Sequence, residues 1–204
     1  MVADGPIEPV TARLRLRQWC DADRAPFAAL NADPEVMRYF ASVVSREASD
    51  STLSVWQADL AERGWGNWAV EVVQTGEFIG FVGLSVPRRA ELPFMPCVEI
   101  GWRLSRPHWG HGYATEAAGA ALRMGFERLR LHEIVSFTSL INRPSRAVME
   151  RIGMLDSGED FDHPALPAES ELRRHCLYKI GCQRWRAAAA RAIQPVPTER
   201  ATPP

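Results

Sequence analysis

The spacing of hydrophobic and polar residues changes several times along this chain, and each change marks an expected strand or helix. Strands are expected where apolar residues alternate with polar ones, or run on for a few residues between turn signals. The stretches with that pattern are Leu14–Trp19, Asn67–Gln74, Glu77–Val86, Cys97–Ser105, Glu133–Ile141 and His175–Ile180. The dipeptide Thr75-Gly76 lies between the second and the third of them and predicts a hairpin.

Helical spacing fills most of the intervals between these strands. The predicted helices cover residues 22–31, a short piece opened by Asp33-Pro34, residues 47–63, a segment that starts after Gly112, residues 144–152 and residues 183–193. Gly64 and Gly153 are expected to end two of them. Antiparallel strands therefore come first and a β-α-β-α section follows. This order predicts an α/β fold with a mixed, mostly antiparallel sheet of about seven strands flanked by helices.

Composition and charge exclude several classes of protein. The 204 residues are 46% hydrophobic and 24% charged, with a formal net charge of -1. No overall positive field exists, so neither nucleic acid nor a membrane surface is an expected partner. Residues 11–193 are expected to form one domain, between a flexible arm at 1–10 and a disordered, proline-rich tail at 194–204. The four cysteines contain no C-x-x-C pair, which favours reduced thiols in a cytoplasmic protein without a metal site.

One segment, Leu104–Ala117 with the sequence LSRPHWGHGYATEA, points to ligand chemistry. Gly110 and Gly112 allow a sharp turn just before a helix, and the first amides of that helix have no partner within it. Unpaired amides at the positive end of a helix bind phosphate, so the segment predicts a phosphate-binding turn. No G-K-[ST] ends it, as a Walker loop requires, and Thr115 stands where a dinucleotide fingerprint has its third glycine. A plain turn without a ligand is the alternative.

The same segment resembles the pyrophosphate loop of the GNAT acetyltransferases, [QR]-x-x-G-x-[GA], although Pro107 stands where Gln or Arg is usual. Trp109–Ala117 is similar to the W-G-x-G-Y-A-T-E-A form of the RimJ/RimL branch. EIGW at Glu99–Trp102 and the segment from Asn142 to Met154 also resemble that branch. The resemblance spans roughly residues 11–180 and implies the GNAT fold with acetyl-CoA as co-substrate. The residues that it implies for acetyl-CoA binding are Arg103, Leu104, Trp109, Gly110, His111, Gly112, Tyr113, Ala114, Thr115 and Asn142.

The resemblance also implies direct transfer of the acetyl group to an amine, which requires a base and an acid. Glu99 is the candidate base, and the alternative is a carboxylate at the sheet edge that pairs with a neighbouring Arg or Lys. Ser145 is the candidate acid, and Asn142 and Ser145 also suit the start of a helix, where their side chains bond to backbone amides. Met149 stands where many GNAT enzymes have a tyrosine acid, and Phe137 where ribosomal-protein alanine acetyltransferases have a glutamate. Those two mechanisms therefore do not transfer directly.

Several further residues have two interpretations. His163 and His175 lie in the last third of the chain and are alternative bases, although histidines that order a loop or a strand face fit the pattern equally. Trp65, Trp68 and Phe40 are candidates for walls of the acceptor site or for core residues.

Two functions compete at this level. The first is an enzyme that acetylates a primary amine, either a protein N-terminus or a small molecule. The second is a non-catalytic acyl-CoA-binding module that regulates a partner. Met149 and Phe137, which replace the tyrosine and glutamate of other GNAT enzymes, are the reason to consider it. A homodimer is possible, since similar proteins are often dimers.

Overall fold

A computed structural model describes residues 5–87 and 91–193 of the chain. The strands are β1 (Leu14–Arg17), β2 (Asn67–Val72), β3 (Phe78–Ser85), β4 (Glu99–Leu104), β5 (Glu133–Ser139), β6 (Leu155–Asp156), β7 (Phe161–Asp162) and β8 (Arg174–Gly181). The α-helices are α1 (Arg24–Ala32), α2 (Arg46–Arg63), α3 (Tyr113–Arg123), α4 (Arg143–Arg151) and α5 (Cys182–Ile193). Short helical turns lie at η1 (Asp21–Asp23), η2 (Arg106–His108) and η3 (Met124–Arg128).

The strands form one eight-stranded sheet in the order β1-β2-β3-β4-β5-β8-β6, with β7 also paired to β8. Every pairing is antiparallel except that of β4 with β5. The mixed, mostly antiparallel α/β sheet expected from the sequence is confirmed. The six stretches named above all form strands, and two further strands of two residues each between α4 and β8 bring the total to eight, against about seven expected.

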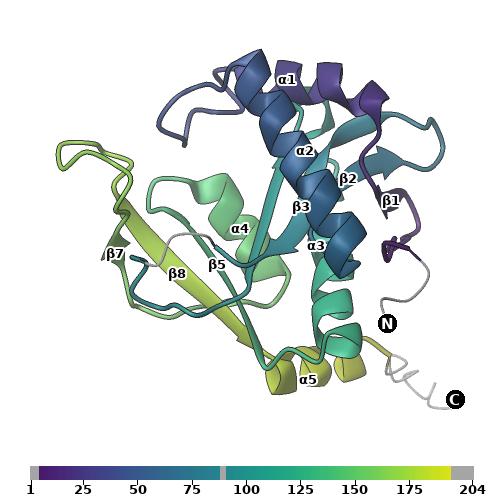
Figure 1. The fold of residues 1–204 in the computed structure, drawn as a ribbon. Coiled ribbons are helices and arrows are strands. Elements are labelled where there is room, and N and C mark those ends of the chain that lie inside the picture. The colour runs from purple at the N-terminus through teal and green to yellow at the C-terminus, as the bar shows by residue number, and fades with distance from the viewer. Residues whose placement is uncertain (1–4, 88–90, 194–204) are drawn as a thin grey trace, which may run out of the picture.

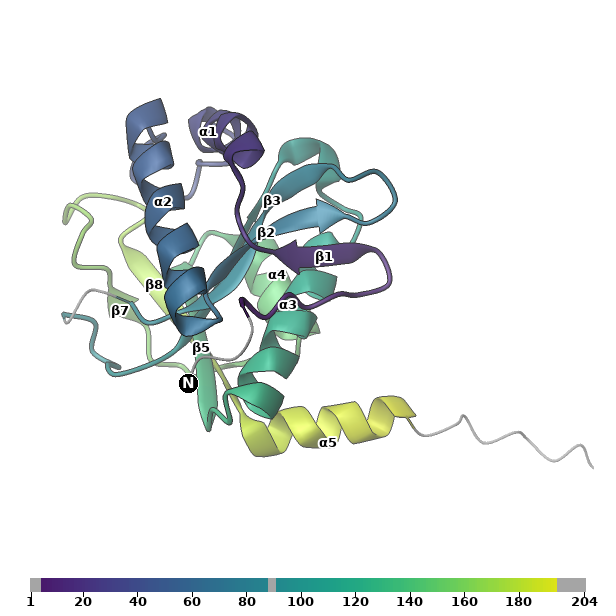
Figure 2. The ribbon, with the colours of Figure 1, turned by 45° about the vertical axis from the view of Figure 1, so that its right-hand side comes forward.

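Helices cover both faces of the sheet (Figures 1 and 2). The first face carries α1 and α2, the second carries α3 and α4, and α5 lies across one end of the sheet. On the first face, rings of Trp19, Phe27, Trp56 and Phe81 pack with centroids 4.6–6.3 Å apart. On the second, α3 buries the small side chains of Ala117, Ala118, Ala120 and Ala121, so its backbone lies close to the strands.

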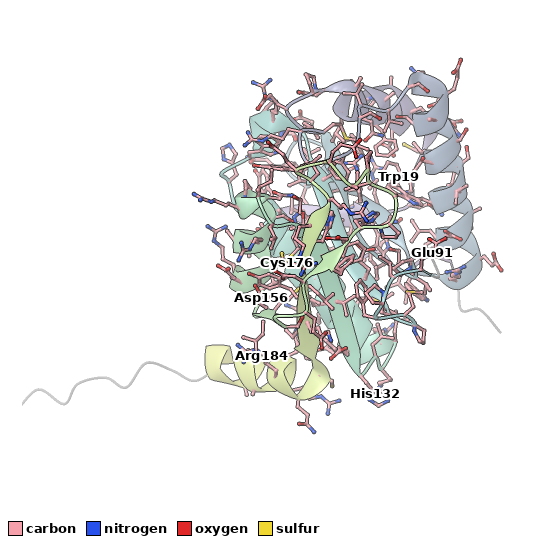
Figure 3. All side chains as sticks on the ribbon, turned by 90° about the vertical axis from the view of Figure 1, so that its left-hand side faces the viewer. Trp19, Glu91, His132, Asp156, Cys176 and Arg184 are labelled. Atoms are coloured by element: carbon pink, nitrogen blue, oxygen red, sulfur yellow. The ribbon has the colours of Figure 1, made fainter. Side chains whose placement is uncertain are left out.

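A second, smaller core lies on the first face, over β5 and β8. It contains Leu92, Val135, Phe161 and Leu177, with Phe94 and Phe137 packed against it. Leu92 and Phe94 come from the segment that leads into β4, residues 91–98. Figure 3 shows Glu91, at the start of this segment, on the α2 side of β8, with Asp156 on the opposite side. This segment therefore covers the first face of the sheet over β5 and β8.

Local chemistry explains where the sequence was right and where it was wrong. Gly64 ends α2 with a φ of 76°, as expected of a C-terminal glycine. The short helix expected after Asp33 does not form, and residues 34–40 make turns instead. The Asp33 carboxylate accepts the Glu35 amide at 2.8 Å, as the first residue of a helix does, and the Met37 amide bonds to the Asp33 carbonyl at 3.0 Å, but the chain does not continue this single turn into a helix.

The N-terminal residues that the structure describes contact the domain. Ile7 donates its amide to the Gly64 carbonyl at 2.9 Å and accepts a hydrogen bond from the Trp68 indole at 2.7 Å. Residues 1–4 and the expected tail at 194–204 lie outside the described residues.

Candidate active site

The glycine turn before α3 is exposed and conformationally special. Gly110 and Gly112 both have a φ of 78°, a region that side chains with a Cβ rarely adopt. The first backbone bond of α3 runs from the Glu116 amide to the Gly112 carbonyl at 3.0 Å. The amides of Tyr113, Ala114 and Thr115 precede that bond and therefore have no carbonyl within the helix to bind.

The space beside the turn suits a phosphate group. A Cβ built on Gly110 meets no described atom within 4 Å, and one on Gly112 meets only the Arg13 guanidinium, at 3.6 Å. Trp109 fixes the start of the turn, because its indole donates to the Leu104 carbonyl at 2.7 Å. The chain thus presents amides, a helix N-terminus and a nearby cation at an accessible position, which is the set of groups that holds a diphosphate.

A contact that the sequence did not predict connects this turn to the residues just before β1. Arg13 donates to the His111 carbonyl at 3.0 Å and pairs with the Glu116 carboxylate at 2.6 Å. The Thr11 hydroxyl donates to the same carboxylate at 2.6 Å, and the arginine lies 4.7 Å above the ring centroid of Tyr113. Arg13 and Glu116 are 103 positions apart in the chain, so no local pattern signals their contact.

The parallel strands β4 and β5 are paired at one register position, Glu99 with Val135, next to a bond from the Val135 amide to the Val98 carbonyl at 2.9 Å. Figure 1 shows the two halves of the sheet separating beyond this point, with α4 visible between them. The turn at Gly110 follows the separated end of β4 after the short helical turn η2. A molecule bound at the turn is therefore adjacent to the gap in strand pairing between Leu104 and Ser139.

Glu99 lies at the joined end of β4, on the face covered by α1 and α2. Its register partner Ser85 and the pair Phe81–Arg103 lie on that same face. The carboxylate is partly buried and makes no hydrogen bond or ion pair within the described part of the chain. Burial raises the pKa of Glu99 from its ordinary value of 4.5 to about 8. A carboxylate that takes up protons near neutral pH is chemically suited to act as a base.

Arg103 projects from the other end of β4 on the same face. Its Nη1 donates to the Asn31 side-chain oxygen, and the guanidinium carbon lies 4.2 Å from the ring centroid of Phe40 and 5.5 Å from that of Phe81. Its Nε is buried and has no hydrogen-bond partner in the described part of the chain. The resemblance implies a role for Arg103 in acetyl-CoA binding, and it gives no indication of these side-chain contacts.

Asn142 and Ser145 lie together at the start of α4. The Asn142 side-chain oxygen accepts the Ser145 amide at 3.2 Å, and its nitrogen donates to the Thr138 hydroxyl at 2.8 Å. Asn142 therefore caps the helix, as one of its two interpretations required. The Ser145 hydroxyl is partly exposed and has no hydrogen-bond partner among the described residues. Met149 is buried in the core, and its thioether has no proton to donate.

The two candidate histidines are neighbours. The ring centroids of His163 and His175 lie 4.8 Å apart, and both rings lie near those of Phe137 and Phe161. His175 is buried, which lowers its pKa, and its Nδ1 lies 3.0 Å from the Arg173 carbonyl. These contacts place the histidines in an aromatic cluster at the edge of the second core.

The aromatic side chains proposed as acceptor walls divide into two groups. Trp68 is completely buried in the main core. Trp65 lines a groove of about 400 Å³ between α2 and the end of β3, and Phe40 is 43% exposed above Arg103. Only the latter two remain candidates for contact with an acceptor.

Comparison with known proteins places this geometry in a family. Residues 13–155 match the family model described as an acetyltransferase (GNAT) domain. The uncharacterized protein YkkB of Bacillus subtilis is 37% identical over 148 residues, which cover 71% of this chain and 83% of that protein. The FsC-acetyl coenzyme A-N(2)-transacetylase of Aspergillus fumigatus is 32% identical over 181 residues, covering 86% of this chain and 76% of that protein.

A solved acetyltransferase of the GNAT family from Bacillus anthracis superposes with a TM-score of 0.72 at 26% identity, covering 87% of this chain and 99% of that one. The sequence match, the fold and the exposed glycine turn beside the gap between β4 and β5 agree with one another. The chain belongs to the GNAT family and is an acetyl-CoA-dependent N-acetyltransferase.

Proposed function

We propose that this enzyme acetylates a primary amine bound on the α1–α2 face of β4, with Glu99 as the base and Ser145 as the acid. The observation that carries the proposal is Glu99 itself. It is a partly exposed carboxylate without a partner in the described residues, on the strand that leads into the glycine turn. When bound, acetyl-CoA supplies a thioester to which the acceptor nitrogen adds, so that a C–N bond forms as the C–S bond breaks.

The chain's own residues divide the remaining work. The backbone amides from Gly110 to Thr115 hold the pyrophosphate, with Trp109, His111 and Tyr113 shaping the turn, and the backbone of Arg103 and Leu104 orients the pantetheine arm. Asn142 sets the start of α4 and so positions Ser145 near the end of β5. The resemblance to the GNAT acetyltransferases implies these assignments, and the position of the glycine turn next to the separated strands supports them.

Proton transfer is well matched at Glu99. A peptide α-amine has a pKa of about 7.7–8.0, close to the value of about 8 for the Glu99 carboxyl. Transfer of a proton from an ammonium group to Glu99 Oε is therefore nearly balanced in free energy, which favours a base that acts directly or through one water. The Ser145 hydroxyl donates a proton to the departing thiolate and regains one from the attacking nitrogen, which loses its second proton as the amide forms.

An acceptor screen with detection of free thiol tests the proposal. Wild-type protein is mixed with acetyl-CoA and a panel of small amines and peptides, and thiol release is compared with that of Glu99→Gln. Removal of a general base is expected to lower kcat/KM by about 100-fold or more. An unchanged rate in a folded Glu99→Gln variant would remove Glu99 from the mechanism.

Some finer expectations stay proposals. We place the enzyme near the RimJ/RimL branch on the W-G-x-G-Y-A-T-E-A form of Trp109–Ala117, and we expect a cytoplasmic protein that can form a homodimer. All four cysteines are free thiols in the structure. No helix in the described ranges is both long and apolar enough to cross a membrane.

A further inference from the structure

Two unsatisfied polar atoms lie at the same end of the α1–α2 face of the sheet. In residues 5–87 and 91–193, three buried side-chain atoms lack a hydrogen-bond partner, and two of them are Arg103 Nε and Ser139 Oγ. Arg103 is near the end of β4 and Ser139 is the last residue of the neighbouring strand β5. Buried polar atoms without partners cost free energy, so their presence near a proposed active site suggests that a ligand completes the network.

The charge of Arg103 also has no counterion among the described residues. Its nitrogens approach no carboxylate in the part of the chain that the structure describes, and burial is the single cause of its lowered pKa. That pKa is about 10, so the guanidinium keeps its positive charge at pH 7. The side chain has an amide oxygen and two ring faces as neighbours. Such neighbours solvate a cation only in part, whereas a carboxylate would offset the charge and accept two hydrogen bonds.

The strand between Arg103 and Glu99 leaves room for a small molecule. Gly101 lies between them on the same face, and a Cβ built there meets only Glu99 Oε1, at 4.0 Å, among the described atoms. Four residues of strand separate the two side chains by about 13 Å between Cα atoms, and both side chains are long enough to shorten that span. One end of the space therefore holds the proposed base and the other an uncompensated cation.

We propose that Arg103 binds a carboxylate of the acceptor, so that the preferred acceptor is a small amine that carries a carboxylate a few bonds from its nitrogen. This inference rests on the proposed function, because it assumes that the amine reacts beside Glu99. The amine then lies near Gly101 and the carboxylate reaches the guanidinium under Phe40. Arg103 acts as a specificity-determining residue, and the Asn31 side chain holds its guanidinium in place.

The test compares ω-amino acids of increasing chain length with their own carboxamides. The two members of each pair have nearly the same shape, but only the acid carries the negative charge. For wild-type enzyme we expect at least one chain length at which kcat/KM for the acid exceeds that for the amide by about 30-fold or more. In Arg103→Met that ratio should fall close to one, mainly through KM, and Arg103→Lys should retain part of it.

The control is Arg38→Met, since Arg38 is an exposed arginine of the same α1–α2 segment, paired with Glu35 at 3.5 Å. It should keep the wild-type ratio. Loss of a merely structural role at Arg103 would lower the rates with acid and amide equally, so the ratio separates recognition from damage to the fold.

Three results would count against the inference in distinguishable ways. If wild-type enzyme acetylates acids and amides equally at every length, the inference is wrong and amine acetylation stands. The inference is also wrong if Arg103→Met, folded by circular dichroism, keeps the preference. If acetyl-CoA binds and no amine releases thiol, the proposed function itself fails, and the inference with it.

Discussion

Replacement of Glu99 by Gln should stabilise the folded protein, and the gain should grow with pH. Glutamine keeps the shape of the side chain and removes the ionisable group. Burial raises the pKa of the Glu99 carboxyl from 4.5 to about 8 in the folded state. Between those pH values the folded wild-type protein retains a proton that the unfolded chain has already lost. The stability of the wild type therefore falls as pH rises through this window, and that of Glu99→Gln does not fall for this reason.

The size of the effect follows from the change in proton affinity. Each tenfold change is worth about 1.4 kcal/mol, so a shift from 4.5 to about 8 sets an upper limit of about 5 kcal/mol. Glu99 is partly exposed, and water that reaches it reduces the difference. We expect the advantage of Glu99→Gln in free energy of unfolding to increase by at least about 1 kcal/mol, the worth of a shift of one in pKa, between pH 5 and pH 8.

Urea unfolding followed by fluorescence of the seven tryptophans measures this difference at each pH. Other groups titrate alike in both proteins, so their contributions cancel in the comparison. A free-energy difference that is the same at pH 5 and pH 8 would refute the raised pKa. The kcat/KM of the wild type should rise as pH approaches 8, because Glu99 acts as a base in its deprotonated form. The residual kcat/KM of Glu99→Gln should not show this rise.

Three further variants test other parts of the site. Gly112→Trp should abolish acetyl-CoA binding in calorimetry, because the new side chain fills the space beside the turn. The control Gly158→Trp, at another exposed glycine with positive φ, should bind acetyl-CoA normally. Equal affinity of both variants would contradict the proposed binding site. Ser145→Ala should slow turnover with little change in the affinity for acetyl-CoA, whereas an unaltered rate would leave water as the proton donor. Asn142→Ala removes the cap of α4 and the bond to Thr138 and should lower the free energy of unfolding by about 1 kcal/mol; full wild-type stability would argue against the cap.

Much of the fold followed from local patterns in the sequence. The alternation of hydrophobic and polar residues predicted the strands of the β2–β3 hairpin. Glycines with positive φ end α2 and begin α3, because such glycines favour a local conformation regardless of what packs on them. The turn at Gly110–Gly112 was recognised for the same reason. The short helix expected after Asp33 does not continue beyond one turn, although the Asp33 carboxylate accepts the Glu35 amide as at a helix start.

The properties that depend on distant neighbours were decided by the tertiary structure. The sequence marked Glu99 as a carboxyl on a strand, but its raised pKa comes from burial on a face shared with Ser85 and Arg103. The contact between Arg13 and Glu116 and the uncompensated charge of Arg103 likewise require segments far apart in the chain to meet. Sequence periodicity records which residues share one strand or helix face. Desolvation and the pairing of charges depend on what the rest of the chain places against that face, so only the folded molecule determines them.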